Sequence, residues 1–299
     1  LTDGGIETVL VFHEKIELPH FASYPVLRDE AGQALIRRYY DEFVALASRH
    51  GVGLELGSTT WRANPDWVER IDGSRDATAG INRQAIDFLS AYRDSLTGEV
   101  PMPISGSVGP RGDGYVADTS MTPDEAADYH RTQIEALAET EADLATVYTL
   151  NYVEEAIGIA RAADTASLPV AISFTVETDG RLPTGQPLGE AIQQADEATN
   201  ATPVYYMINC AHPTHFESTL ATDEAWLTRL RGLRANASTL SHAELDDMTE
   251  LDEGDPIDLG RRIADVVKRL PAVSVLGGCC GTDVRHIAAI ASACFAADA

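Results

Sequence analysis

Residues 272–283 read A-V-S-V-L-G-G-C-C-G-T-D, a short run of apolar and β-branched residues that ends in glycines and two adjacent cysteines. The run predicts a buried strand, and Gly277 and Gly278 predict a place where the backbone approaches another group closely. Adjacent cysteines do not bridge each other comfortably, because a disulfide needs Cα atoms about 5.5 Å apart. Cys279 and Cys280 are therefore predicted to be free thiols at the end of a strand.

Six further segments of the same kind precede this one. They lie at 52–57, 101–108, 142–149, 169–175, 203–210 and 230–238. Amphipathic stretches separate them, and two of these begin with capping patterns, at 122–125 and 241–244. Strands that alternate with helices indicate a parallel sheet. A further strand, mostly upstream of Asp3-Gly4-Gly5, would make eight and would favour a (β/α)₈ TIM barrel, expected as one domain over residues 1–299.

The chain is strongly acidic, with 47 acidic and 22 basic residues and a formal net charge of −25. Such a surface repels phosphate backbones, which argues against nucleic acid as a partner. It also favours a protein that works in high salt, where counterions screen self-repulsion, over an acidic soluble protein without that adaptation. No apolar run reaches the roughly 18 residues of a membrane span, and no leader pattern is visible, so we expect a cytoplasmic protein with reduced thiols and no membrane contact.

Nearly every predicted strand ends in polar or small residues. These ends are Asp3-Gly4-Gly5, 58–61, 105–107, Tyr148, Ser173, Asn209-Cys210, Asn236 and Cys279-Cys280. In a barrel they would meet at the carboxyl-terminal rim, where this fold places its active sites. Turns after strands are often polar for other reasons, so the pattern indicates a site without naming its chemistry.

Three of the four cysteines fall at these strand ends. Cys210 precedes Cys279 by 69 positions, roughly two strand–helix units of about 31 residues each, so all three sulfur atoms can meet over the barrel mouth. Three thiolates and one open position suit a catalytic zinc site. Cys210 could instead be a small buried residue, and His212 or His215 could enter the shell or cap a helix; Cys294 fits an apolar helix.

Four motifs, taken together, resemble the homocysteine S-methyltransferase family. They are D-G-G at 3–5, I-S-F-T with D-G-x-L-x-x-G-x-P-L within 172–188, I-N-C-x-x-P at 208–213 and G-G-C-C-G-T at 277–282. The resemblance covers essentially the whole chain. It implies a zinc-bearing barrel in which Cys210, Cys279 and Cys280 hold Zn²⁺ and a substrate thiol completes the shell.

The resemblance also implies substrate contacts. Asp3 with the backbone of Gly4 and Gly5 would receive the ammonium and carboxylate of an amino acid, and Ser58 would take the family's position on the second strand. Zinc keeps a thiol deprotonated and nucleophilic, so the thiol would attack the methyl group of a small donor such as S-methylmethionine or betaine. A cationic donor needs an anionic or aromatic cradle, for which Trp61, Trp67, Tyr148 and Tyr152 are candidates.

The sequence departs from the family pattern where the substrate should lie. Tyr148 stands at the fourth-strand position where the family usually has a glutamate, and a neutral phenol does not replace that charge. Arg62, in the unusual segment 58–67, is placed to meet a carboxylate. The segment 234–246 replaces a shorter turn. These changes indicate altered contacts to the substrate rather than to the metal.

The main hypothesis is a zinc-dependent S-methyltransferase whose partners are a small thiol and a small methyl donor. Ser173 and Asn209 join the expected substrate-binding residues because they end the neighbouring strands. A zinc hydrolase and a non-catalytic thiol- or metal-binding barrel are the alternatives. The chain could also form a homo-oligomer.

Overall fold

Seven parallel strands form one curled sheet in the computed structural model, which describes residues 1–98, 100–117 and 120–295. The strands are β1 (Leu56–Gly57), β2 (Ile104–Val108), β3 (Leu144–Leu150), β4 (Val170–Phe174), β5 (Tyr205–Asn209), β6 (Leu230–Ala235) and β7 (Val275–Gly278). They stand in the sheet in chain order, each paired in parallel with the next. The seven strands expected from the apolar runs are thus confirmed.

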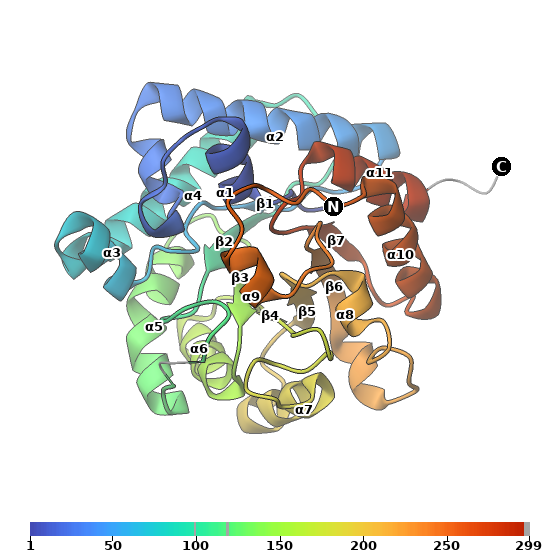
Figure 1. Cartoon of the computed structure of the whole chain (residues 1–299). Coiled ribbons are helices and arrows are strands. Elements are labelled where there is room, and N and C mark those ends of the chain that lie inside the picture. Colours follow the sequence, from blue (N-terminus) through green and yellow to red (C-terminus); the bar gives the residue numbers. More distant parts are fainter. Residues whose placement is uncertain (99, 118–119, 296–299) are drawn as a thin grey trace.

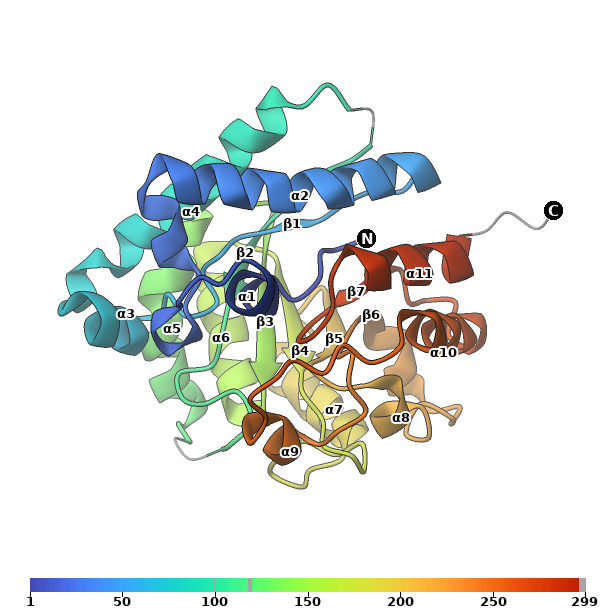
Figure 2. The same cartoon turned by 45° about the horizontal axis from the view of Figure 1, so that its top comes forward.

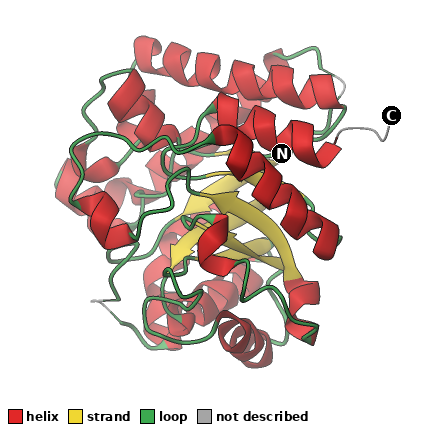
Figure 3. Ribbon diagram, turned by 45° about the vertical axis from the view of Figure 1, so that its right-hand side comes forward, coloured by secondary structure: helices red, strands yellow, loops and turns green. Residues whose placement is uncertain are grey.

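Helices lie around the outside of this sheet (Figure 1), as Figure 3 also shows from another side. They are α2 (Glu30–His50), α3 (Pro65–Asp72), α4 (Thr78–Ser95), α5 (Pro123–Ala138), α6 (Val153–Ala166), α7 (Leu188–Thr199), α8 (Pro213–Phe216), α10 (Pro256–Arg269) and α11 (Val284–Phe295). Two short helices, α1 (Ile6–Thr8) and α9 (His242–Asp246), follow the Asp3-Gly4-Gly5 segment and β6. No helix within the described ranges is long and apolar enough to span a membrane.

Residues 1–3 lie between the two edge strands of the sheet. On one side, Glu55 N–H donates to the Leu1 carbonyl (2.8 Å); on the other, Thr2 N–H donates to Leu276 O (2.8 Å) and Gly278 N–H to Asp3 O (3.0 Å). The structure therefore has seven strands and a three-residue connection between its edges, not the eight strands that we expected. Three residues make too few ladder bonds with either neighbour to form a strand of their own.

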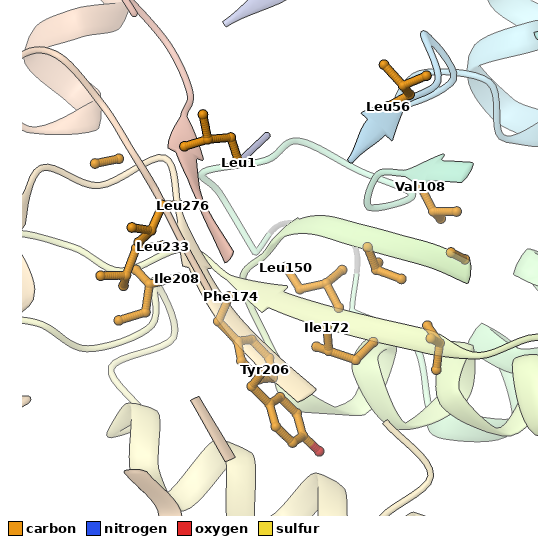
Figure 4. Close-up of a cluster of buried hydrophobic side chains, with 14 of the residues drawn as sticks. Leu1, Leu56, Val108, Leu150, Ile172, Phe174, Tyr206, Ile208, Leu233 and Leu276 are labelled. Carbon is orange, nitrogen blue, oxygen red and sulfur yellow. The ribbon is translucent and has the colours of Figure 1, made fainter. Parts of the chain in front are cut away.

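The apolar faces of the strands and helices form a continuous core. Figure 4 shows Leu1 beside Leu276, with other core side chains along the curled sheet. Phe174 and Tyr206 are fully buried on adjacent strands and stack with ring centroids 6.2 Å apart. Strands that are buried on both faces explain why their sequences read as continuous apolar runs instead of alternating patterns.

Both predicted capping patterns are confirmed. Thr122 begins α5, where its hydroxyl accepts from Glu125 N–H while the Glu125 carboxylate accepts from Thr122 N–H. Ser241 and Glu244 make the same reciprocal pair at α9. Each pair satisfies two backbone donors that a helix start would otherwise leave free. The second pair fixes where α9 starts after β6, over the middle of the sheet in Figure 1.

Close packing of α5 against α6 depends on Gly158. A Cβ at this position would lie 2.5 Å from Pro123 O and 2.7 Å from Ala127 N, both backbone atoms of α5. We therefore expect Gly158→Ala to lower the free energy of unfolding by about 1–3 kcal/mol, measured by urea denaturation. Gly80→Ala is the control, because nothing lies within 4 Å of its new Cβ in α4; it should stabilise by about 0.5–1 kcal/mol. Equal effects of the two substitutions would contradict the packing argument.

Candidate active site

Three thiols meet at the carboxyl ends of β5 and β7. Cys210 follows β5, and Cys279 and Cys280 follow β7. All three are free, their sulfur atoms lie within 4.8 Å of one another, and Cys210 Sγ is 2.6 Å from Cys279 Sγ and 3.6 Å from Cys280 Sγ. The convergence expected from the spacing of these cysteines is therefore observed.

The backbone at Cys210 is held in an unusual conformation. Its φ is +55°, a left-handed value that non-glycine residues seldom adopt. Two side chains hold its carbonyl oxygen: Asn236 Nδ2 donates at 3.1 Å and His242 Nε2 at 2.6 Å. Strain of this kind persists only where the surroundings enforce it, and here it aims the Cys210 sulfur at the other two.

The pKa values of the cysteine thiols are shifted in opposite directions. Hydrogen bonds from Cys210 and Cys280 hold the pKa of Cys279 well below its usual range, and the nearby Arg234 acts in the same direction. The same contacts raise the pKa of Cys210. A cluster that already favours one thiolate is suited to bind a cation.

Tyr115 lies directly against this cluster. Its hydroxyl is 3.3 Å from Cys210 Sγ and 3.6 Å from Cys280 Sγ, and its ring stacks on His242 with centroids 4.2 Å apart. His242 Nδ1 in turn faces Glu177 Oε1 at 3.1 Å. Sequence reasoning missed Tyr115, which lies in the loop after β2, because a tyrosine in a glycine-rich loop carries no spacing signal.

The cluster forms part of the wall of a cavity of about 400 Å³. The residues predicted from sequence that line it are Asp3, Gly4, Gly5, Ser58, Trp61, Arg62, Tyr148, Asn209, Cys210, Cys279 and Cys280. Ser173 is not among the lining residues. Its hydroxyl donates instead to Asn209 Oδ1 (2.6 Å), so Ser173 supports Asn209 from behind.

Asn209 links three strand ends. Its Oδ1 also accepts from Thr149 N–H (2.8 Å), and its Nδ2 donates to Thr149 Oγ1 (2.9 Å) and contacts Cys279 Sγ at 3.8 Å. The side chain is buried and its orientation is determined by these partners. It therefore positions the Cys279 sulfur through a rigid polar network.

A buried arginine that the sequence reading missed occupies the space beside Asp3. Arg234, on β6, donates to Asp3 Oδ1 (2.7 Å), Gly4 O (3.0 Å), Gly278 O (2.9 Å) and the Tyr148 hydroxyl (3.1 Å). The second oxygen of Asp3 accepts from Tyr39 (3.0 Å). Burial raises the pKa of Asp3, and the charge of Arg234 opposes that rise. Both oxygens of Asp3 are thus already bound within the protein.

Tyr148 lies where the sequence placed it, near the carboxyl end of β3. Its ring lies 4.9 Å from the Arg234 guanidinium carbon, and burial raises its pKa, so the phenol stays neutral. A glutamate here would face Arg234 directly. Tyr148 and Arg234 therefore pack against each other and share a hydrogen bond.

Two of the aromatic side chains that we expected to bind a cationic donor, Trp61 and Trp67, instead contact Arg62 of the protein itself. Arg62 is buried between two tryptophans, with its guanidinium carbon 4.3 Å from the Trp61 ring centre and 4.0 Å from that of Trp67, and it donates to Gly112 O at 2.9 Å. Burial lowers the pKa of Arg62 to about 10. The Tyr152 hydroxyl accepts from Met121 N–H (3.2 Å), and Tyr152 does not line the cavity.

The other candidate ligands lie elsewhere. His212 is the N-cap of α8, where Nδ1 accepts from Thr214 N–H at 3.3 Å, and His215 donates to Thr239 O at 2.9 Å. Of the two roles considered for these histidines, the structure shows helix capping for His212. Cys294 lies half-buried on α11 and packs against the core.

Comparisons with known proteins agree with this geometry. The family model described as homocysteine S-methyltransferase matches residues 1–294. Homocysteine S-methyltransferase 4 of Zea mays is 25% identical, over 98% of this chain and 88% of its own length. Homocysteine S-methyltransferase 2 of Arabidopsis thaliana is 27% identical, over 79% of this chain and 77% of its own length.

Solved structures show the same fold. The metallated form of the homocysteine methyltransferase MmuM from Escherichia coli superposes with a TM-score of 0.73 at 19% identity, over 98% of this chain and 95% of MmuM. The oxidized form of MmuM gives a TM-score of 0.75 at 20% identity, over 97% and 94% of the two chains. The family match over nearly the whole sequence shows that this chain is a methyltransferase that belongs to the homocysteine S-methyltransferase family.

Proposed function

We propose that this protein is a zinc-dependent S-methyltransferase that moves a methyl group from a small donor, such as S-methylmethionine or betaine, to a thiol such as homocysteine, giving methionine. The observation that carries the proposal is the cluster of Cys210, Cys279 and Cys280 in the wall of the cavity. The names of the curated relatives support a thiol amino acid as the acceptor.

The three cysteines suit zinc. Thiolate sulfur is a soft ligand that favours zinc over magnesium or calcium, and three protein ligands leave one position for a substrate atom. The sulfur atoms are already gathered within 4.8 Å of one another. When bound there, zinc would lower the pKa of the substrate thiol, so that it reacts as a thiolate near neutral pH.

The residues around the cysteines hold the sulfur atoms in place. Asn209 orients Cys279, while Asn236 and His242 hold the Cys210 carbonyl. Outer partners of this kind orient ligands and are worth about 10–100-fold in metal affinity or activity. The site is therefore organised before a substrate enters, and little of the protein has to rearrange during the reaction.

In the proposed reaction, a lone pair of the substrate sulfur forms a bond to the methyl carbon while the bond from that carbon to the donor's positive sulfur or nitrogen breaks. The donor leaves as a neutral thioether or amine with the electron pair. The chain needs no nucleophile of its own. Its contribution is to hold the two substrates in line, which can supply a large part of the barrier reduction.

The cavity wall favours a cationic donor. Asp3, Glu7, Asp113, Asp246, Glu250 and Asp252 line it, against only Arg62 and Arg234. Clefts lined by one sign of charge concentrate ligands of the opposite sign. Because Arg62 stacks on Trp61 and Trp67, carboxylates supply more of this attraction than aromatic faces do.

A zinc hydrolase has less support than a methyltransferase. Among the described residues, no histidine lines the cavity to act as a general base beside a metal. Three thiolate ligands would also weaken zinc as a Lewis acid. A non-catalytic thiol-binding barrel is separated from the enzyme by the turnover assay below.

We further propose that the seven strands and residues 1–3 make a TIM barrel, as one domain over residues 1–299. The hydrogen bonds of residues 1–3 to both edge strands support this arrangement. Four free cysteines support a reducing compartment such as the cytoplasm. A homo-oligomer remains a prediction.

Removal of a metal-binding cysteine should abolish both zinc binding and turnover. We expect Cys280→Ala to lower zinc affinity by more than the roughly 10–100-fold typical of losing an outer partner, and to reduce methionine formation from homocysteine and S-methylmethionine to background. The measurements are zinc content after dialysis and chromatographic detection of methionine. Cys294→Ala is the control and should match the parent, because Cys294 lies on α11 away from the cavity. A Cys280→Ala protein with parental zinc content and turnover would refute the assignment.

Removal of Arg234 should destabilise the fold as well as the site. Arg234→Met leaves the buried Asp3 carboxylate without its counter-charge, so we expect the free energy of unfolding to fall by about 3–5 kcal/mol. Arg261→Met, which breaks exposed ion pairs on α10, should cost less than about 1 kcal/mol. Urea denaturation of both variants measures the difference. Similar losses in the two variants would show that Arg234 does not hold the rim together.

A further inference from the structure

Glu7 lies on α1, two residues after Gly5, and its side chain lines the cavity. Asp3 and Cys279 are near enough for their charges to act on it. Glu7 therefore faces the same space as the cysteine cluster. The four motifs that identify the family do not include it, and sequence reasoning assigned it no role.

The carboxylate of Glu7 has few partners within the protein. Ser23 donates to Oε1 at 2.8 Å, and the carboxylate also has a hydrogen bond to the backbone of Glu7 itself, but no described lysine, arginine or histidine forms an ion pair with it. Burial raises the pKa of Glu7 to about 7, and the negative charges of Asp3 and Cys279 add to that effect. A half-buried carboxylate without an ion-pair partner gains free energy when a cation binds beside it.

The two arginines that line the cavity are committed to other groups. Arg234 is paired with Asp3 and bound to the carbonyls of Gly4 and Gly278. Arg62 is held between two tryptophan rings and donates to Gly112 O. The charge of Glu7 acts on Arg62 across space, but neither arginine forms an ion pair with Glu7, so a bound cation would be its first direct counter-charge among the described groups.

Asp3, by contrast, is not available for a ligand. Its two oxygens accept from Arg234 and Tyr39, and only 5% of its side chain is exposed. An ammonium group could bind Asp3 only by displacing one of these donors. Of the two carboxylates that flank Gly4 and Gly5, Asp3 has an arginine as its ion-pair partner and Glu7 has none among the described residues.

We infer that Glu7 is the cation receptor of this cavity and binds a positively charged group of a substrate. Two sources carry this chemistry, namely the ammonium group of an amino-acid thiol and the sulfonium or quaternary ammonium of the methyl donor. The inference deepens the proposed function and rests on it for the identity of these substrates. It assigns to α1 the charge that the family usually places at the position of Tyr148, which lies on β3 here.

Glu7→Gln tests the inference, because it removes the charge and keeps the shape. Binding of four compounds to the zinc-loaded protein is measured by calorimetry without turnover: homocysteine, 4-mercaptobutanoate, S-methylmethionine and betaine. 4-Mercaptobutanoate is homocysteine without its ammonium group. KM and kcat for the reactive pairs are measured in parallel, and exposed Glu17→Gln serves as the matched control.

The expected result is a loss of about 10–100-fold in affinity for the compound whose cation Glu7 binds, as for one charged hydrogen bond. Weaker binding of homocysteine with unchanged 4-mercaptobutanoate would identify the thiol's ammonium as the source. Weaker binding of S-methylmethionine or betaine, with both thiols unchanged, would identify the donor. Unchanged affinity for all four compounds would overturn the inference, and so would a fall in kcat with unchanged KM values.

The stability of the ligand-free protein gives an independent test. A carboxyl whose pKa is raised in the folded state lowers stability as the pH rises from its unfolded value, near 4.5, to about 7. The groups that face Glu7 are Asp3, Cys279, Arg62, Tyr40 and Ser23, and all of them remain in the variant. Glu7→Gln should therefore raise Tm at pH 8 and leave it nearly unchanged near pH 4. A lower Tm at pH 8 would show that the protein itself already compensates the charge.

These measurements separate the inference from the proposed function. If the parent protein forms no methionine from any pair of substrates, the proposed function fails. The calorimetry and the Tm values still decide whether Glu7 receives a cation.

Discussion

The rest of the site depends on the ion pair between Arg234 and Asp3 and on the other hydrogen bonds of the Arg234 guanidinium. This guanidinium joins Asp3 and Gly4, the end of β7 at Gly278, and Tyr148 on β3 through four hydrogen bonds. A charge buried this deeply must be paired and hydrogen-bonded, because leaving it unpaired costs several kcal/mol. These partners come from the start, the middle and the end of the chain, and Figure 2 shows the N-terminal segment beside β7.

This pairing decides how charge is distributed in the cavity. Because Arg234 neutralises Asp3, the carboxylate next to the Gly4-Gly5 backbone is no longer a free anion. Glu7 then becomes the acid next to this segment that has no ion pair among the described residues, while Asp113, Asp246, Glu250 and Asp252 line the cavity as well. The cavity therefore stays attractive to cations, although Asp3 of the D-G-G motif is paired with Arg234.

The cysteine cluster is organised by a different set of contacts. Asn209 reaches across β3, β4 and β5, and it touches the Cys279 sulfur. His242, at the start of α9, holds the Cys210 carbonyl and stacks against Tyr115. The cysteine cluster and the Asp3–Arg234 pair thus have mostly different hydrogen-bond partners.

Local patterns in the sequence were enough to locate the seven strands, the capping boxes at Thr122 and Ser241, and the meeting of Cys210 with Cys279 and Cys280. These features depend on short runs of residues and on the regular repeat of strand and helix, so spacing carries the information. The surroundings of Arg234, Tyr115 and Glu7 became visible only in the folded chain. An arginine in an apolar strand is read as a solvent-facing residue until its partner, 231 positions away, is seen beside it. Pairing of buried charges is a property of distances between remote segments, and only folding sets those distances.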